Sequence, residues 1–315
     1  LGGPLTITDC NLALGRIQPR AFPAVFGPAG NQPLDADAAH RALARLADDV
    51  AAETGRRLSP LELAEGLIGI ANAHMADAIR RISIARGHDP ATHALVAFGG
   101  AGGQHACALA DALGMKAAVL PVDAGLLSAR GIGAADLIVT RERTVALPFG
   151  PTLDTQAPPL AEALGAEARA ALEAQGLPLA ALHLRLIAHV RYAGADTALP
   201  LPFGPMPSMQ ADFEAAHQAR FGFLTPEAPL LLDMLEAEAR GTPPGAARAS
   251  PGFTTTGKSH PPRVRLHAGG QGVEAPLIPR DTLSPGARVQ GPAIIADSGS
   301  TALVAPGWGA RVHAS

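Results

Sequence analysis

Cysteine is scarce in this sequence of 315 residues, because Cys10 and Cys107 are the only two. Two thiols are too few for a disulfide framework or a thiolate zinc site, so we expect neither kind of cross-link to support the fold. The sequence also lacks the basic segment followed by an apolar segment that marks a secretory signal. These absences predict a reducing, cytoplasmic setting.

Long apolar runs and an excess of positive charge are missing as well. No apolar run approaches the length of a membrane span, so we expect a soluble chain with no membrane partner. The formal charge is −3, from 25 basic and 28 acidic residues, which predicts no nucleic-acid partner. Hydrophobic residues are plentiful at 47%, enough for substantial cores. The length favours two or three structural units.

Helix and strand signals alternate up to about residue 145. Residues 59–62, Ser-Pro-Leu-Glu, form a capping box with proline at the first helical position, which predicts the start of a helix. Strand signals at 94–98 and 117–120 flank a predicted helix at 103–113. So short a crossover predicts parallel strands, and therefore an α/β fold.

The rest of the chain divides into three regions by composition. Residues 146–240 are predicted to be an α+β region, in which residues 182–192 alternate between apolar and polar side chains, as in a sheet with one wet face. Residues 241–262 are rich in glycine, proline and serine, which predicts a linker or long loop. Residues 263–315 contain short apolar runs cut by turns, which predicts a small β-rich unit.

A glycine-rich loop lies in the stretch LVAFGGAGGQH, residues 95–105. A dinucleotide fingerprint that starts at Gly100 would need a glycine where His105 stands, and a phosphate P-loop would need a lysine that this loop lacks. Two interpretations remain. The glycines either permit close packing in a tight turn between strand and helix, or let an adenosine lie flat against the backbone.

Seven stretches, in order along the chain, resemble the hydantoinase A/5-oxoprolinase family. They are GGPLTITDCNLALGR (2–16), MADAIRRISIARGHDP (75–90), LVAFGGAGGQHACALADALG (95–114), DAGLLSARGIGAADL (123–137), VRYAG (190–194), AHQARFG (216–222) and LSPGARVQGPAIIADSGSTALVAPGW (283–308). The resemblance therefore extends from near the first residue to near the last.

The resemblance implies one half of an actin-like (ribonuclease H-like) ATPase core with helical decoration, followed by a β-rich C-terminal region. Residues 1–145 would then form the adenosine-side subdomain of that core. The implied nucleotide-binding residues are Gly99, Gly100, Gly102, Gly103, Gln104 and His105. The last two would stand at a helix N-terminus, where backbone N–H groups favour anions.

The family couples ATP hydrolysis to the opening of a cyclic amide such as 5-oxoproline or a hydantoin, and it usually works with a B-type subunit. The resemblance therefore implies a hydrolase of a small-molecule cyclic amide, with ATP and magnesium as cofactors. Two alternatives stay open. The chain could belong to an ATP-dependent carboxylase subunit of the acetone or acetophenone type, or be a non-catalytic module that docks the partner subunit.

Family members carry, upstream of the matching stretches, Asp-Gly-Gly-Thr-type loops that hold the ATP phosphates and magnesium. The sequence has no such loop. The resemblance therefore implies that this chain is the C-terminal portion of a longer subunit, that it holds no metal by itself, and that it is inactive alone.

Asp9 is the one catalytic candidate. The stretch Thr6 to Asn11 either caps the following helix or directs Asp9 toward a substrate or metal, as the family resemblance would allow. His74 lies in an apolar helical pattern, which predicts a hydrogen-bonded core histidine rather than a ligand. His183 and His189 share the polar side of their strand, where we expect solvent rather than metal.

Overall fold

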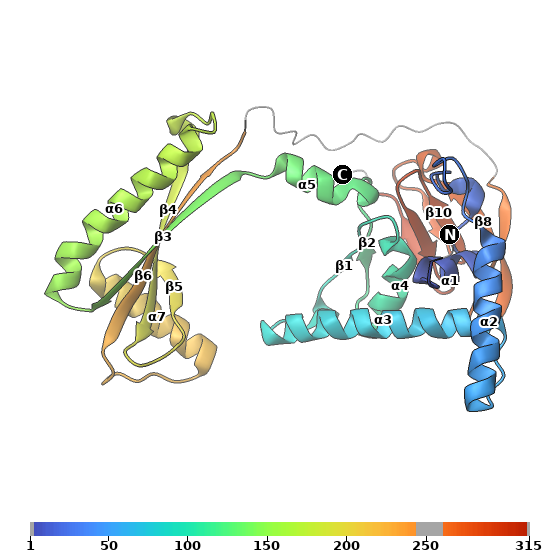
Figure 1. Ribbon diagram of the computed structural model, residues 1–315, viewed down its shortest axis with the longest axis horizontal. Coiled ribbons are helices and arrows are strands. Elements are labelled where there is room, and N and C mark those ends of the chain that lie inside the picture. The colour runs from blue at the N-terminus through green and yellow to red at the C-terminus, as the bar shows by residue number, and fades with distance from the viewer. Residues whose placement is uncertain (1–2, 244–260, 314–315) are drawn as a thin grey trace. The chain divides into compact units, whose positions relative to one another are not determined.

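The computed structural model describes residues 3–243 and 261–313, and these divide into two compact units. Unit 1 is built from residues 1–130 and 249–315, and unit 2 from residues 131–248. Figure 1 draws the elements of both units along the chain.

The helices of unit 1 begin at well-formed caps. The Ser59 hydroxyl accepts the Glu62 N–H while the Glu62 carboxylate accepts the Ser59 N–H, so the predicted capping box is confirmed. The Asp35 side chain caps α2 in the same region, and Gly55 ends that helix with φ +70°. The unit contains α1 (Ile7–Ala13), α2 (Ala36–Thr54), α3 (Pro60–Ala85) and α4 (Gly102–Leu113), and α5 (Leu127–Ala134) begins within it.

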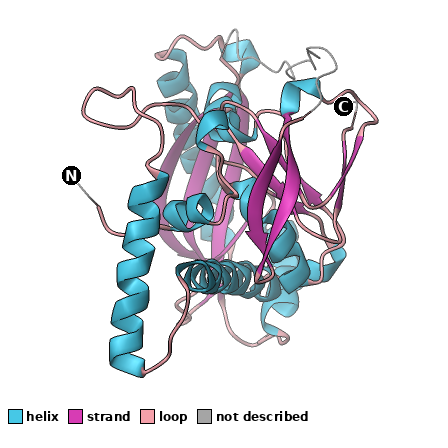
Figure 2. Ribbon diagram, turned by 90° about the vertical axis from the view of Figure 1, so that its right-hand side faces the viewer, coloured by secondary structure: helices cyan, strands magenta, loops and turns pink. Residues whose placement is uncertain are grey.

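The strands of unit 1 come from two distant parts of the chain. The parallel pair β1 (Leu95–Val96) and β2 (Ala118–Val119) flanks α4, as the sequence predicts. A second sheet has the order β11-β10-β8-β7, and β9 pairs with β12. Figure 2, in which α3 is seen nearly end-on, shows these strands beside the helices. Their bounds are β7 (Arg263–Ala268), β8 (Gln271–Pro279), β9 (Arg288–Gln290), β10 (Ala293–Ala296), β11 (Thr301–Val304) and β12 (Gly309–Arg311).

Unit 2 is an antiparallel sheet packed against two helices. Its described strands have the order β3-β6-β4-β5. The hydrophobic core between sheet and helices includes Leu164, Phe213 and Leu235, each nearly inaccessible to solvent. The elements are β3 (Leu137–Pro148), α6 (Pro151–Glu173), β4 (His183–Tyr192), β5 (Leu199–Pro202), α7 (Met206–Phe221) and β6 (Leu230–Gly241).

A register shift explains how β4 and β6 keep one apolar face. In β6 the inward residues change from even to odd numbers between Leu232 and Leu235, and the pairing with β4 shifts at His189/Val190. An extra residue in one strand reverses the side to which later side chains point. The bulge therefore leaves Asp233 beside Arg191, with Oδ1 2.9 Å from Nε.

The division of the chain differs from the expected one. The expected boundary at residue 145 falls inside β3, which pairs with β6 of unit 2 along its length. The strands after residue 262 belong to the same compact unit as residues 1–130 instead of standing alone. Of the expected linker 241–262, residues 244–260 lie outside the described residues. Over the described ranges, every helix is too short or too polar to span a bilayer.

Candidate functional site

The glycine-rich loop follows β1 at the carboxyl edge of the parallel pair. The chain turns at Gly99, where φ is +82°, and the Gly99 N–H donates to the Ala124 carbonyl across 2.7 Å. Ala124 follows β2, so this bond ties together the two segments that leave the pair. In open α/β sheets, ligands bind outside the carboxyl ends of the strands. The loop therefore stands at the edge where a ligand is expected.

The first part of the loop is open. A methyl group added at Gly99 would have no atom within 4 Å. Gly100 and Ala101 are exposed. The positive φ at Gly99 is one that only glycine adopts without strain. The backbone of Gly99 and Gly100 is thus accessible to a molecule that approaches the turn.

The second part of the loop is packed. Gly103 is buried, and a methyl group there would lie 2.7 Å from Leu120 Cδ2 and 2.9 Å from Ala302 Cα. At Gly102 the nearest atom would be the Ala97 carbonyl carbon, 3.6 Å away. Close packing against β11 and against Leu120, which follows β2, therefore accounts for Gly103.

Gln104 and His105 lie in the first turn of α4 with buried side chains, exposed to only 6% and 7%. His105 Nδ1 is 2.8 Å from Asn72 Oδ1 of α3. Gln104 Oε1 has no hydrogen-bond partner among the described residues. The six predicted nucleotide-binding residues thus differ in exposure: Gly100 is exposed, Gly99 and Gly102 are half-buried, and Gly103, Gln104 and His105 are buried. Their nucleotide contacts stay a prediction.

Burial and, to a smaller extent, the charge of Arg16 lower the pKa of His105 below its usual value of 6.5. The unfolded chain therefore binds more protons than the folded chain once the pH falls below about 6.5. We expect the free energy of unfolding to decrease as the pH falls through that window. Denaturant unfolding at pH 7.5 and 5.5, followed by the fluorescence of Trp308, measures the decrease.

The matched variant is His105→Gln, whose amide can still donate to Asn72 Oδ1 but does not titrate. It should lose less stability than the parent between the two pH values. An equal loss in both proteins would show that His105 is not the titrating group.

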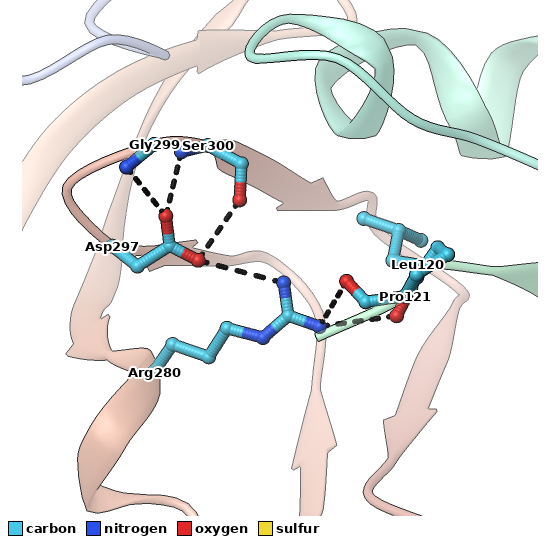
Figure 3. Close-up of polar contacts among 6 residues, drawn as sticks. All are labelled: Leu120, Pro121, Arg280, Asp297, Gly299 and Ser300. Carbon is cyan, nitrogen blue, oxygen red and sulfur yellow. Dashed lines mark hydrogen bonds and ion pairs between the residues drawn. The ribbon is translucent and has the colours of Figure 1, made fainter. Parts of the chain in front are cut away.

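Figure 3 shows a second group of polar contacts, centred on Arg280 and Asp297, which the sequence did not predict. Arg280 Nη2 donates to the carbonyls of Leu120 and Pro121 across 3.0 and 2.8 Å, and Nη1 is 3.5 Å from Asp297 Oδ2. Asp297 opens the turn between β10 and β11. The polar residues 297–300, between two apolar runs, predict a turn, but nothing in the sequence connects that turn to Arg280.

The Asp297 carboxylate closes its own turn. Oδ1 accepts the N–H groups of Gly299 and Ser300 across 2.7 and 2.6 Å, and Oδ2 accepts the Ser300 hydroxyl across 2.9 Å. Side chains of Asp commonly stabilise turns in this way. Hydrogen bonds within the turn thus fix its shape, and the contact with Arg280 connects it to the segment after β2 (Figure 3).

The turn between β10 and β11 touches the glycine-rich loop directly. The Thr301 N–H donates to the Gly100 carbonyl across 3.1 Å. A methyl group at Gly100 would lie 3.2 Å from the Gly299 carbonyl oxygen, and one at Gly125 would collide with the same oxygen. Three segments, around residues 100, 125 and 299, therefore meet at the carboxyl edge of β1 and β2.

Asp123 lies between β2 and the turn at Gly125. Its Oδ2 accepts a hydrogen bond from Arg130 Nη1 across 2.7 Å. This bond lowers the pKa of Asp123, with smaller contributions from the charges of Arg130 and Arg280. The Asp123 carboxylate is therefore ionised at neutral pH, close to the three meeting segments.

Asp9 serves as a helix-capping residue. Its Oδ2 accepts the Thr6 N–H across 2.8 Å and the Thr6 hydroxyl across 2.7 Å, while the Asp9 N–H donates to Thr6 Oγ. This is the capping interpretation of residues 6–11, with a reciprocal capping box at α1. A catalytic role for Asp9 stays a prediction.

The structure places His74, His183 and His189 in three different surroundings. His74 is exposed on α3, so the prediction of a core position is wrong. The helix turns that side toward solvent, because its buried positions are Leu63, Ala64, Ile68 and Ala76. His183 is exposed as expected, whereas His189 Nε2 is 2.7 Å from Glu236 Oε2. Among the described residues, no three His, Cys, Asp or Glu side chains gather as metal ligands.

A surface hollow of about 400 Å³ lies between the C-terminal parts of α3 and α4 and the segment 87–90. Arg80, His88, Asp89 and Leu113 are among its lining residues. None of the six predicted nucleotide-binding residues lines it, so we do not assign it to the nucleotide.

Comparisons with known proteins agree on one family. The profile of the family described as hydantoinase/oxoprolinase matches residues 1–141. A 5-oxoprolinase from Pestalotiopsis fici is 34% identical over 99% of this chain, and one from Dictyostelium discoideum is 32% identical over 98%. The alignments cover 25% of each relative, so the chain spans about a quarter of the length of these 5-oxoprolinases.

Two solved structures have a similar fold. Acetone carboxylase in a nucleotide-free state matches 98% of this chain and 45% of its own with a TM-score of 0.73 and 21% identity, a likeness of fold alone. The ATP-dependent caprolactamase from Pseudomonas jessenii matches the same shares with a TM-score of 0.72 and 25% identity. Both likenesses agree with a mixed α/β architecture of helices and several sheets.

Proposed function

Because the chain belongs to the hydantoinase/oxoprolinase family, we propose that it is part of an ATP-dependent hydrolase of cyclic amides and supplies the adenosine side of the ATP cleft. The observation that carries this proposal is the open turn at Gly99 and Gly100, which follows a parallel strand and precedes a helix. A flat nucleoside can approach such a backbone because no side chain holds it away. The actin-like core is part of the same proposal.

ATP would make ring opening easier by activating the amide. The carbonyl carbon of a cyclic amide is a poor electrophile, and phosphorylation of its oxygen would let water attack that carbon. Phosphoryl transfer of this kind depends on positioning and on cations that neutralise the phosphates. We propose that the phosphates and magnesium are bound by residues outside this sequence, and that the Gly99–Gly100 turn holds only the nucleoside.

A B-type partner subunit is also part of the proposal. One relative that is 28% identical over 96% of this chain is called caprolactamase subunit alpha, a name that implies a further subunit in that enzyme. The substrate of the present protein would be a small cyclic amide. A screen of 5-oxoproline, hydantoins and lactams with the full-length subunit and its partner would identify it.

The test of the nucleoside site is Gly99→Ala in the full-length subunit. The added methyl group points into open space, so it meets the ligand rather than the protein. We expect the dissociation constant of ATP, measured by calorimetry, to rise about tenfold, which is roughly 1.4 kcal/mol. Gly100 is less suitable, because a methyl group there lies 3.2 Å from Gly299 O and would disturb packing.

Gly222→Ala is the matched control. Gly222 has the same φ of +82° as Gly99 and no atom within 4 Å of an added methyl group, but it follows α7 in unit 2. Both variants place an alanine at the same positive φ, so a difference in ATP affinity between them reports contact with the ligand. Equal ATP affinity in Gly99→Ala and Gly222→Ala would contradict the adenosine site.

A further inference from the structure

Arg280 and Asp297 form a polar connection that the proposed function does not use. Both side chains are largely enclosed, with 21% and 29% of their surface exposed. Arg280 is separated by about 160 residues from the two carbonyls that it binds, at Leu120 and Pro121. A bond between such distant segments fixes their spacing at the cost of ordering a long side chain.

The two carbonyls lie just after β2, in the segment that leads to Ala124. Gly99 donates to the Ala124 carbonyl, three residues beyond Pro121. In the segment 120–124, Arg280 thus binds the first two carbonyls and Gly99 binds the last. Loss of its guanidinium would leave two carbonyls and a carboxylate without their charged donor.

On its other side Arg280 holds the turn between β10 and β11. Asp297 transmits this contact, because its carboxylate also binds the N–H groups of Gly299 and Ser300 (Figure 3). The Gly299 carbonyl oxygen would lie 3.2 Å from a methyl group at Gly100, and the Thr301 N–H donates to the Gly100 carbonyl. Arg280 therefore contacts, directly or through one residue, both segments that flank the Gly99–Gly100 backbone.

We propose that Arg280 is a positioning residue of the nucleoside site and that the turn Asp297 to Ser300 is the second wall of that site. The inference rests on the proposed function. Ser298 and Gly299 are exposed at the tip of the turn, and Gly100, which the turn touches, is exposed as well. An adenine nucleoside that lies against Gly99 and Gly100 would meet this tip.

The shape of the guanidinium explains why arginine suits this position. Its planar fork presents donors in two directions, so one nitrogen can serve the carbonyls while the other faces the carboxylate. A lysine ammonium is a single point of charge and cannot span both in the same geometry. Arg280→Lys should therefore keep the charge and lose the positioning.

The test measures ATP binding by the full-length subunit with Arg280→Ala. We expect the dissociation constant of ATP to rise about tenfold, corresponding to roughly 1.4 kcal/mol, while the KM of the cyclic amide stays the same. Added guanidinium ion at millimolar concentration should restore part of the ATP affinity, because it can occupy the space of the missing group. Arg280→Lys should bind ATP more weakly than the parent.

Trp308→Phe is the control for a merely structural effect. The Trp308 indole N–H donates to the Asp111 carboxylate across 3.2 Å, so it also connects the C-terminal strands with α4, but near the far end of that helix from the loop. This variant should lose stability without losing ATP affinity. Asp297→Asn serves as the second variant if Arg280→Ala does not fold, and it should weaken ATP binding in the same direction.

The outcomes separate the two proposals. If Gly99→Ala leaves ATP affinity unchanged, the nucleoside site itself is wrong. If Gly99→Ala weakens ATP binding while folded Arg280→Ala and Asp297→Asn bind ATP like the parent, the positioning role is overturned. An equal loss of ATP affinity in Trp308→Phe and Arg280→Ala would also overturn it, because the effect would then follow stability alone.

Discussion

Residues 1–315 by themselves should release no phosphate from ATP above the background rate. Phosphoryl transfer needs cations and donors around the γ-phosphate, and the family resemblance assigns these to loops that this sequence does not contain. The chain aligns with only 25% of the 5-oxoprolinases from Pestalotiopsis fici and Dictyostelium discoideum. A phosphate-release assay with the purified chain, ATP and magnesium measures the rate.

The positive control is the longer subunit with the B-type partner that we propose, assayed with a cyclic amide. Addition of EDTA to the purified chain removes magnesium and so distinguishes metal-dependent ATP hydrolysis from free phosphate that was already present in the nucleotide. Appreciable ATP turnover by residues 1–315 that EDTA abolishes would contradict the prediction and would place a phosphate site within this chain.

Gly103→Val should destabilise unit 1 more than any other single change in the glycine-rich loop. A side chain at this position begins 2.7 Å from Leu120 Cδ2 and 2.9 Å from Ala302 Cα. Leu120 can rotate away, but the backbone of β11 cannot move without disturbing its hydrogen bonds to β10. Overpacking of this kind costs about 1–3 kcal/mol, and valine adds two further methyl groups, so we expect a loss of about 3 kcal/mol.

Denaturant unfolding followed by Trp308 fluorescence suits this measurement, because Trp308 is the only tryptophan of the sequence and lies in unit 1. Gly69→Val is the matched control. Gly69 is also helical, and an added methyl group there would have no atom within 4 Å. The control should change the free energy of unfolding by less than about 1 kcal/mol. Similar losses in the two variants would mean that Gly103 is not required for packing.

The Gly99→Ala and Gly103→Val experiments test whether the glycines of the loop serve ligand contact or packing. The alternatives of packing and ligand contact, which pattern alone leaves open, apply to different residues of the same loop. Gly103 is enclosed by β11 and Leu120, whereas Gly99 faces open space. The burial of each glycine in such a loop cannot be predicted from the sequence, because glycine has no side chain whose polarity would indicate whether it is buried or exposed.

Local patterns determined much of the secondary structure. The capping box at Ser59, the alternation in residues 182–192 and the short crossover between β1 and β2 depend on neighbours in the chain, so they could be predicted. Strand β3 was missed because it is largely exposed and only a few of its apolar residues face the core. An edge strand of that kind carries a weak alternation.

The sequence by itself also determined the family, since the matching stretches lie in order along nearly the whole chain. Only the tertiary structure decided which segments surround the glycine-rich loop. Gly299 contacts Gly100 across about 200 positions of the chain, and Arg280 contacts the segment after β2 across about 160. The physical reason is that side-chain periodicity records which face of an element is buried, but not which distant element covers it.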